Sequence, residues 1–247
     1  MDQKNRTILV LAIAVTVFAA VFVSLGLPAL TGRAPEVVLP DVNQEAVSTE
    51  GRDFLPVEVR PDTVQSVIVS LSRPESYYRQ LTVRLFWAGG SSADPVEIWA
   101  DGGYVRTAIT TGGSTQYRLV GEGKLRLWYA GDRAWQEVDA GDDTADLAQR
   151  IPTYEDVLAL DPGQITGTGY EEKDGARCIY VEVYREELGY LERYWISVSS
   201  GLLTAAETEK DGRVVYAMSS SQLVSPLAGG EDAFTLPEGR VLHRPGE

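Results

Sequence analysis

The sequence predicts an α+β fold: a curved antiparallel sheet forming an open half-barrel covered by a few helices, preceded by one N-terminal transmembrane helix. Three observations predict it. Residues 96–138 alternate in polarity, are rich in β-branched and aromatic residues, and are divided by glycine-rich joints that suit tight hairpins. Helical patterns lie on both sides of this stretch, and an uncharged apolar segment lies near the N-terminus. A sheet of about ten antiparallel strands must curl or split, and helices laid over its concave face satisfy that constraint.

The N-terminal apolar segment is long enough to cross a bilayer. No charged residue lies within residues 7–32, and a helix of that length spans a bilayer core of about 30 Å. Lys4 and Arg6 precede the segment, so the positive-inside rule places residues 1–6 in the cytoplasm. The alternative is a cleaved signal peptide, whose apolar region would cover only about 7–15 residues. We therefore expect an uncleaved single-pass anchor over residues 7–30, embedded in the lipid bilayer of the cell membrane, with the C-terminal domain extracytoplasmic.

The part of the chain beyond the anchor is predicted to be a linker and one acidic domain. Residues 31–61 hold recurring prolines without helical periodicity, which is typical of an extended linker, and residues 62–247 form the domain. The formal net charge is −14, and an acidic surface repels the phosphates of nucleic acids, so a nucleic-acid partner is excluded. Cys178 is the only cysteine and lies within a predicted strand, where a packed thiol is the simplest interpretation.

The domain opens with a predicted helix and a long strand. Asp62 is the expected N-cap, and Pro74 ends the helix. A strand is the alternative here, because Val and Ile are β-branched. Residues 76–87 alternate as a strand, and residues 89–92 turn the chain toward the meander. The apolar stripe of the helix, at positions i, i+3, i+4 and i+7, consists of Val64, Val67, Ile68 and Leu71.

Short strands joined by glycine-rich turns make up the meander. With such short connections, neighbouring strands must be antiparallel. Within residues 124–130 three apolar side chains share one face, while Arg126 and Trp128 share the other, so both faces are expected to be partly covered. The predicted strands cover residues 95–100, 104–110, 115–120, 124–130 and 134–138.

Two helical patterns interrupt the strands, over residues 139–150 and 152–161. Thr153 can cap the second helix, which has two acidic residues in its first turn. A second run of strands follows, and residues 233–239 form a covering loop. The later strands cover residues 164–172, 177–186, 189–198, 202–210 and 213–224.

No catalytic or metal-binding motif is visible. His243 is the only histidine, so neither a histidine-based triad nor a multi-histidine metal site can be built from this chain. The acidic cluster at residues 139–146 offers oxygen ligands for calcium, but helix capping explains it without a metal. Adjacent glutamates at 171–172 and 186–187 point to opposite faces of a strand, unlike the converging carboxylates of a glycosidase. We expect no enzyme, no cofactor and no bound metal.

Three stretches carry a resemblance to a known family. They are GEGKLRLWYAGDRAW at residues 121–135, YWISVSSGLL at residues 194–203, and EDAFTLPEG at residues 231–239. In this order, after a short helix and a long strand, they resemble the lipoprotein-carrier superfamily of LolA, LolB and RseB over residues 62–240. The resemblance implies an apolar cavity between sheet and helices that binds an acyl lipid, a lipoprotein or a hydrophobic peptide. The predicted anchor favours a stationary acceptor, sensor or regulator over a free shuttle.

The aromatic side chains supply the candidate ligand-binding residues. A tryptophan on a predicted strand can belong to the core or line an apolar pocket, and both interpretations stay open. We expect a membrane-anchored domain that binds or senses a lipid, lipoprotein or hydrophobic peptide. The alternatives are a structural or scaffolding protein of a cell-envelope complex with an envelope protein as partner, and a carboxylate-based envelope enzyme. The candidate cavity residues are Trp87, Trp99, Tyr104, Leu127, Trp128, Tyr154 and Leu158.

Overall fold

The structure is a computed structural model that describes residues 58–140, 151–227, 230 and 232–246. These residues belong to one compact unit, Leu55–Glu247. The predicted cytoplasmic tail, the predicted anchor over residues 7–30 and most of the predicted linker lie outside the described residues, as does nearly all of the predicted helix over 139–150. Within the described ranges, no helix is both long enough and apolar enough to span a bilayer.

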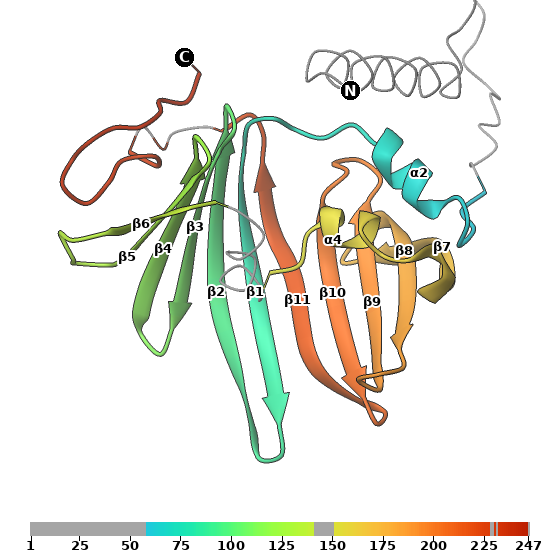
Figure 1. Cartoon of the computed structure of the whole chain (residues 1–247). Helices are drawn as coiled ribbons and strands as arrows, with labels where there is room; N and C mark the ends of the chain where they lie inside the picture. The colour runs from blue at the N-terminus through green and yellow to red at the C-terminus, as the bar shows by residue number, and fades with distance from the viewer. Residues whose placement is uncertain (1–57, 141–150, 228–229, 231, 247) are drawn as a thin grey trace, which may run out of the picture. The chain divides into compact units, whose positions relative to one another are not determined.

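The described chain forms one eleven-stranded antiparallel sheet that does not close (Figure 1). The first and last strands of the sequence, β1 and β11, pair with each other in the middle of the sheet, and β6 and β7 form the edges. The strand order is β6-β5-β4-β3-β2-β1-β11-β10-β9-β8-β7. The strands are β1 Tyr77–Trp87, β2 Gly90–Asp101, β3 Tyr104–Thr111, β4 Ser114–Gly121, β5 Lys124–Tyr129, β6 Gln136–Asp139, β7 Ile165–Lys173, β8 Ala176–Arg185, β9 Tyr190–Ser197, β10 Leu203–Lys210 and β11 Arg213–Val224.

Most hairpins turn at the predicted glycines. At five of them both central residues have positive φ, the geometry of a turn whose twist matches that of the flanking strands. The pairs are Gly102-Gly103, Gly112-Gly113, Glu122-Gly123, Asp174-Gly175 and Asp211-Gly212. The predicted turn over residues 89–92 is wrong: β2 begins at Gly90, whose partner across the hairpin is Trp87, so the turn is only Ala88-Gly89. Pairing continues through the polar residues after Gly90 because β1 offers partners along its whole length.

Within the described ranges, two helices and a short 3₁₀ turn accompany the sheet. The stripe from Val64 predicted a helix, and α2 spans Val64–Ser70, with Thr63 rather than the predicted Asp62 at the N-cap position. The helix α4 spans Tyr154–Leu158, shorter than predicted, and follows Thr153 as its N-cap. The backbone N–H of Thr153 donates to Asp156 Oδ2 at 2.6 Å, as the capping pattern predicted. The 3₁₀ turn η2 covers Pro162–Gln164.

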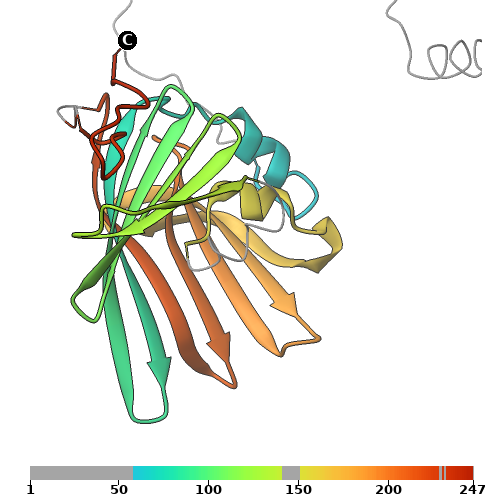
Figure 2. The ribbon, with the colours of Figure 1, turned by 60° about the vertical axis from the view of Figure 1, so that its left-hand side comes forward.

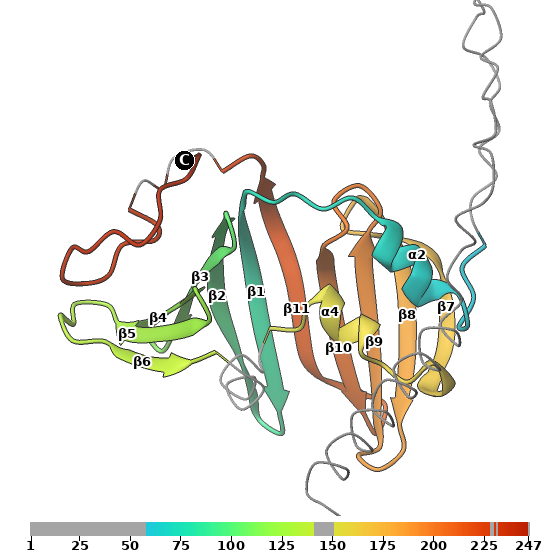
Figure 3. The same ribbon diagram turned by 45° about the horizontal axis from the view of Figure 1, so that its top comes forward.

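The main core lies on the concave face of the sheet, between β7–β11 and the two helices (Figures 2 and 3). Strand β8 shows why this face is apolar: Ile179, Val181 and Val183 alternate along it and are fully buried. Val64 and Ile68 from α2 and Val157 from α4 complete this core. The open antiparallel sheet with a few helices is thus the architecture that the sequence predicted.

A second cluster lies on the opposite face, over β2–β5, under the C-terminal segment. Phe234 and Leu236 from that segment pack against Leu119 and Trp128 from the sheet. A single bridge between Thr235 and Val241, together with the bond from Leu242 N to Phe234 O at 3.0 Å, gives the segment a fixed shape. The predicted covering loop is confirmed, and it covers the convex face.

Candidate functional site

An apolar cavity of about 440 Å³ lies on the concave face of β1–β5, beneath residues 151–155. Ligand pockets in proteins commonly have volumes of about 300–1,000 Å³, so a chain-like organic molecule fits here. Strands β2–β5 and the start of β10 supply aliphatic side chains, and the start of α4 supplies the rim. The apolar lining consists of Tyr77, Ile98, Val105, Val120, Leu125, Ala140, Ile151, Pro152, Tyr154, Leu202 and Leu203.

In the part of the chain that the structure describes, α2 and α4 lie beside the cavity and are tied to each other and to the sheet. The Gln65 side-chain amide of α2 donates to the backbone oxygens of Val157 and Leu160, at 3.2 and 2.8 Å, and ties α2 to α4. The Arg73 guanidinium donates to Gly201 O at 3.1 Å and lies 3.7 Å from the centre of the Tyr154 ring. These contacts hold the two described helices, α2 and α4, over β7–β10 (Figure 3).

The polar groups of the cavity wall are few, and two of them are cationic. Arg79 on β1 and Arg118 on β4 line the cavity together with Glu155 of α4 and the hydroxyls of Thr107 and Thr153. Arg79 is only 8% exposed, and burial lowers the pKa of its guanidinium.

The structure places the predicted cavity residues in several different environments. Tyr154 lines the cavity, and Leu158 packs against the main core beside it. Trp87 is 59% exposed at the β1–β2 hairpin, and Leu127 is half-buried on β5. The other three, Trp99, Tyr104 and Trp128, lie in or against the second cluster on the convex face. Of the cavity residues that were not predicted, those on strands, Arg79 above all, occupy inward positions of alternating runs, and that alternation is the signal that could have found them.

Aromatic rings and one guanidinium form a stack on the convex face of β2–β5. Arg106 lies 4.4 Å from the centre of the Tyr117 ring and 5.0 Å from that of Trp99. Tyr104 stacks on His243 with ring centres 4.8 Å apart. A Cβ atom on Gly121 would lie 2.2 Å from the Tyr104 ring, so glycine is required there for the ring to lie flat on β4. The C-terminal segment covers this stack, which therefore acts as a second core.

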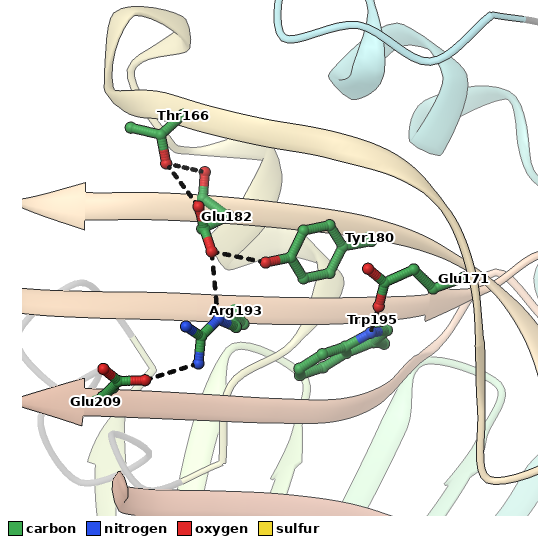
Figure 4. A network of polar contacts seen from close by, with 7 residues as sticks. All are labelled: Thr166, Glu171, Tyr180, Glu182, Arg193, Trp195 and Glu209. Carbon is green, nitrogen blue, oxygen red and sulfur yellow. Dashed lines mark hydrogen bonds and ion pairs between the residues drawn. The ribbon is translucent and has the colours of Figure 1, made fainter. Parts of the chain in front are cut away.

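The convex face of β7–β10 carries a ladder of polar contacts instead (Figure 4). Arg193 donates from Nε to Glu182 Oε2 at 3.2 Å and from Nη1 to Glu209 Oε2 at 3.0 Å. The Tyr180 hydroxyl donates to Glu182 Oε2 at 2.8 Å, and Trp195 Nε1 donates to a carboxylate oxygen of Glu171 at 2.8 Å. Each of these carboxylates accepts a hydrogen bond, which suits cross-strand stabilisation.

Two pKa shifts follow from that ladder. The hydrogen bond from Tyr180, followed by that from Arg193, lowers the pKa of the Glu182 carboxyl. Burial, followed by the hydrogen bond to Glu182, raises the pKa of Tyr180 to about 12. Both shifts favour the carboxylate and the neutral phenol, which are the forms that the hydrogen bond requires.

Among the residues that the structure describes, no group of three or more histidine, cysteine or acidic side chains could hold a metal ion. Asp139, the described member of the acidic cluster at 139–146, pairs with Lys124 across β5 and β6. The other members of that cluster lie outside the described residues. Cys178 is buried against Trp195 and Ala205, and burial raises the pKa of its thiol, so the packed interpretation holds.

Comparison with known proteins finds similarity at the level of structure. No family model and no curated protein sequence matches the chain. The crystal structure of MucB in complex with MucA(peri) matches at 16% identity and a TM-score of 0.40; the match covers 74% of this chain and 62% of that chain. A LolA superfamily protein from Nitrosomonas europaea matches at 11% identity and a TM-score of 0.33, with 72% and 97% covered. LprF from Mycobacterium bovis matches at 12% identity and a TM-score of 0.34, with 68% and 92% covered. The superfamily that residues 62–240 resemble is thus among the matches, which at these scores carry no information on function.

Proposed function

We propose that this chain is a membrane-anchored, extracytoplasmic domain that binds a hydrophobic ligand, such as a lipid acyl chain or a hydrophobic peptide, in the concave-face cavity. The observation that carries the proposal is the cavity itself. It is lined by aliphatic and aromatic side chains from the inner face of β1–β5 and by residues 151–155. A concave apolar site with a few polar groups is the usual form of a small-molecule site.

The energetic case rests on the aliphatic groups that line the cavity. Each methylene group that a ligand removes from water contributes about 0.8 kcal/mol, and the strands already hold the wall in place. Ile98, Val105 and Leu125 belong to strands paired on both sides, so they need not be ordered on binding. A preformed apolar site of this kind loses little entropy when an alkyl chain enters.

The anchor over residues 7–30 and the extracytoplasmic position of residues 62–247 are part of the proposal. An anchored domain stays beside the bilayer, so it suits an acceptor, sensor or regulator that samples molecules from the membrane. Fusion of a reporter that is active only outside the cytoplasm to the C-terminus tests the orientation. Reporter activity is expected, and activity only from a cytoplasmic reporter would overturn the orientation.

A scaffolding role is the second candidate, and a different observation favours it. Phe86, Trp87 and Val214, at the hairpins β1–β2 and β10–β11, are 37%, 59% and 38% exposed and lie beside one another. Exposed aromatic groups of this kind are enriched in protein interfaces. This surface lies away from the cavity residues, so one labelling experiment separates the two roles.

That experiment uses the full chain in lipid nanodiscs and a photoactivatable derivative of methyl dodecanoate as a neutral alkyl probe. Crosslinked peptides are mapped by mass spectrometry. We expect labels on residues 98–125 and 151–155, and loss of those labels in the variant Val105→Phe, whose ring occupies the cavity. Val214→Phe, at the exposed hairpin, is the matched control and should keep them. Labels confined to residues 86–88 and 210–215 would favour the scaffold instead.

A further inference from the structure

We infer that the ligand of the cavity is an amphiphile with an anionic headgroup, a carboxylate or a phosphate, and that the Arg79 guanidinium recognises it. This inference rests on the proposed binding function and names the chemical class of the ligand. It is carried by the surroundings of one buried cation.

Arg79 lies on the concave face of β1, between the inward-facing Tyr77 and Leu81. Its Nη2 donates to the backbone oxygen of Leu203 at 2.8 Å, and its Nε is buried without a hydrogen-bond partner. Among the ion pairs of the described residues, none involves Arg79. Burial removes the hydration of a guanidinium, and a single carbonyl acceptor offsets that cost less well than an anion does.

Among the described residues, the guanidinium of Arg126 is also deeply buried, and it pairs with carboxylates, which is the usual arrangement for a buried charge. It lies on the convex face of β5 with its side chain 6% exposed, and it pairs with Glu137 at 2.8 Å and with Glu122 at 3.6 Å. Two carboxylates thus lie beside this buried arginine. Among the described residues, no carboxylate pairs with Arg79, which lines the cavity.

A second cation strengthens the case. Arg118 lines the same cavity from β4, and its Nε and Nη2 donate to Gln116 Oε1 at 3.1 and 3.0 Å. Glu155 is the one carboxylate among the described residues that line the cavity, and it is exposed at the rim. The wall therefore carries more positive than negative charge in a chain whose net charge is −14. A carboxylate or phosphate accepts the forked donors of arginine in a geometry that a hydroxyl or an ester cannot match.

A purely structural role for Arg79 makes a different prediction. In that role its bond to Leu203 O would fasten β1 to β10, and removal would lower stability without changing which ligand binds. The two roles are therefore separated by headgroup preference, which only the recognition role affects.

The test is a competition experiment on the full chain in nanodiscs, against the neutral methyl dodecanoate probe. Competitors share one chain length: dodecanoate, dodecyl phosphate and dodecanol. Because a hydrogen-bonded charge contributes about 1.5–3 kcal/mol, the two anions should displace the probe at concentrations about 10–100-fold below that of dodecanol. In Arg79→Met this ratio should fall to about twofold or less, whereas Arg79→Lys, which keeps the charge, should retain part of it. Every variant faces the same bilayer, so partition of the amphiphiles cancels between variants.

The matched control is Arg84→Met, on the same strand but at an exposed position, and it should leave the ratio unchanged. Equal competition by all three amphiphiles, with probe labelling intact in the unsubstituted chain, would overturn the inference while the proposed function stands. Absence of probe labelling would overturn the proposed function itself. If inorganic phosphate or acetate competes as well as the amphiphiles do, the site binds free anions. That result would overturn the inference that the ligand is an amphiphile. If Arg79→Met does not fold, the ratio is measured in Arg79→Lys and Arg118→Met instead, and in both it should be lower than in the unsubstituted chain.

Discussion

The two arms of the sheet both consist of antiparallel hairpins, but different elements cover their concave and convex faces. In the arm formed by β7–β10, the concave face is packed with Ile179 and Val181 beneath α2 and α4, and the convex face carries the ladder of Arg193. In the arm formed by β2–β5, the concave face borders the cavity, and the convex face is covered by the C-terminal segment. We call these the helical arm and the aromatic arm.

The difference shows how an open sheet can keep a cavity without losing its stability. Each strand can bury one face or both, and a domain of this size needs only enough buried surface to offset the entropy of folding. In the aromatic arm the buried side has moved to the convex face, where Trp128 and Phe234 meet. The concave face of this arm borders the cavity, as far as the structure describes it.

The largest expected effect concerns the second cluster, on the convex face of the aromatic arm. Phe234 is completely buried, with its ring centre 6.0 Å from that of Tyr104, and truncation of such a side chain costs about 3–5 kcal/mol. Phe234→Ala should therefore lower the free energy of unfolding as much as Ile68→Ala does in α2 of the helical arm, for which about 2–5 kcal/mol is expected. Urea unfolding measures both. A loss below about 1 kcal/mol for Phe234→Ala would show that the C-terminal segment is not part of the core.

A pair of identical substitutions sharpens the comparison between the two concave faces. Val181 lies in the packed core of the helical arm, so Val181→Phe should overpack it and destabilise the domain by about 1–3 kcal/mol. Val105 lines the cavity of the aromatic arm, and Val105→Phe should stabilise the ligand-free domain by about 0.5–2 kcal/mol, as cavity filling commonly does. Thermal unfolding of lipid-free protein measures the difference. Equal destabilisation by both would mean that the cavity is closed in solution.

The sequence predicted the strands and hairpins of the two arms better than it predicted which face of each strand is concave. Glycine pairs such as Gly112-Gly113 and the stripe from Val64 are local signals, so the hairpins and α2 could be found from short windows. Which face of a strand is concave depends on the whole sheet, and alternation alone does not say. Leu127 and Trp128 were both candidates for the cavity, yet neighbouring residues of a strand point to opposite faces, and Trp128 faces the C-terminal segment.

Arg79 was missed for a related reason. In the alternating run of β1 it occupies an inward position beside Tyr77, Leu81 and Val83, and a charged residue at such a position is usually assumed to face solvent. Its burial follows from the pairing of β1 with both β2 and β11, contacts that join residues far apart in the sequence. Only the assembled sheet shows that the charge lies inside.

The third prediction concerns the polar ladder of the helical arm and its pH dependence. The folded-state pKa of Glu182 is lowered, so this carboxylate contributes stability above its unfolded pKa of about 4.3, and the contribution is lost as the pH falls through the lower folded value. The pKa of Tyr180 is raised to about 12, so its contribution is present below its unfolded pKa and is lost as the pH rises through about 12. Tyr180→Phe should cost about 1 kcal/mol at neutral pH, because the groups are partly exposed.

Urea unfolding at several pH values between neutrality and acid tests this link. In Tyr180→Phe the fall in stability toward acid should be shallower than in the unsubstituted chain, since Glu182 has lost its main hydrogen-bond donor. Tyr184→Phe on the same strand, at an exposed position, is the matched control. Parallel curves for all three proteins would contradict the role given to the Tyr180 hydroxyl.

A comparably small effect is expected where the C-terminal segment ends on the aromatic arm. His243 Nε2 lies 2.6 Å from Asp101 Oδ2, and hydrogen bonds from Ser76 and then His243 lower the pKa of the Asp101 carboxyl. Its contribution is therefore present above the unfolded pKa of about 3.9 and is lost only as the pH falls through the lower folded value. Asp101→Asn keeps an acceptor for these donors and should cost about 0.5–1.5 kcal/mol at neutral pH, well below the cost of Phe234→Ala. A loss as large as that of Phe234→Ala in thermal unfolding would mean that the segment is held by this polar contact and not by its buried ring.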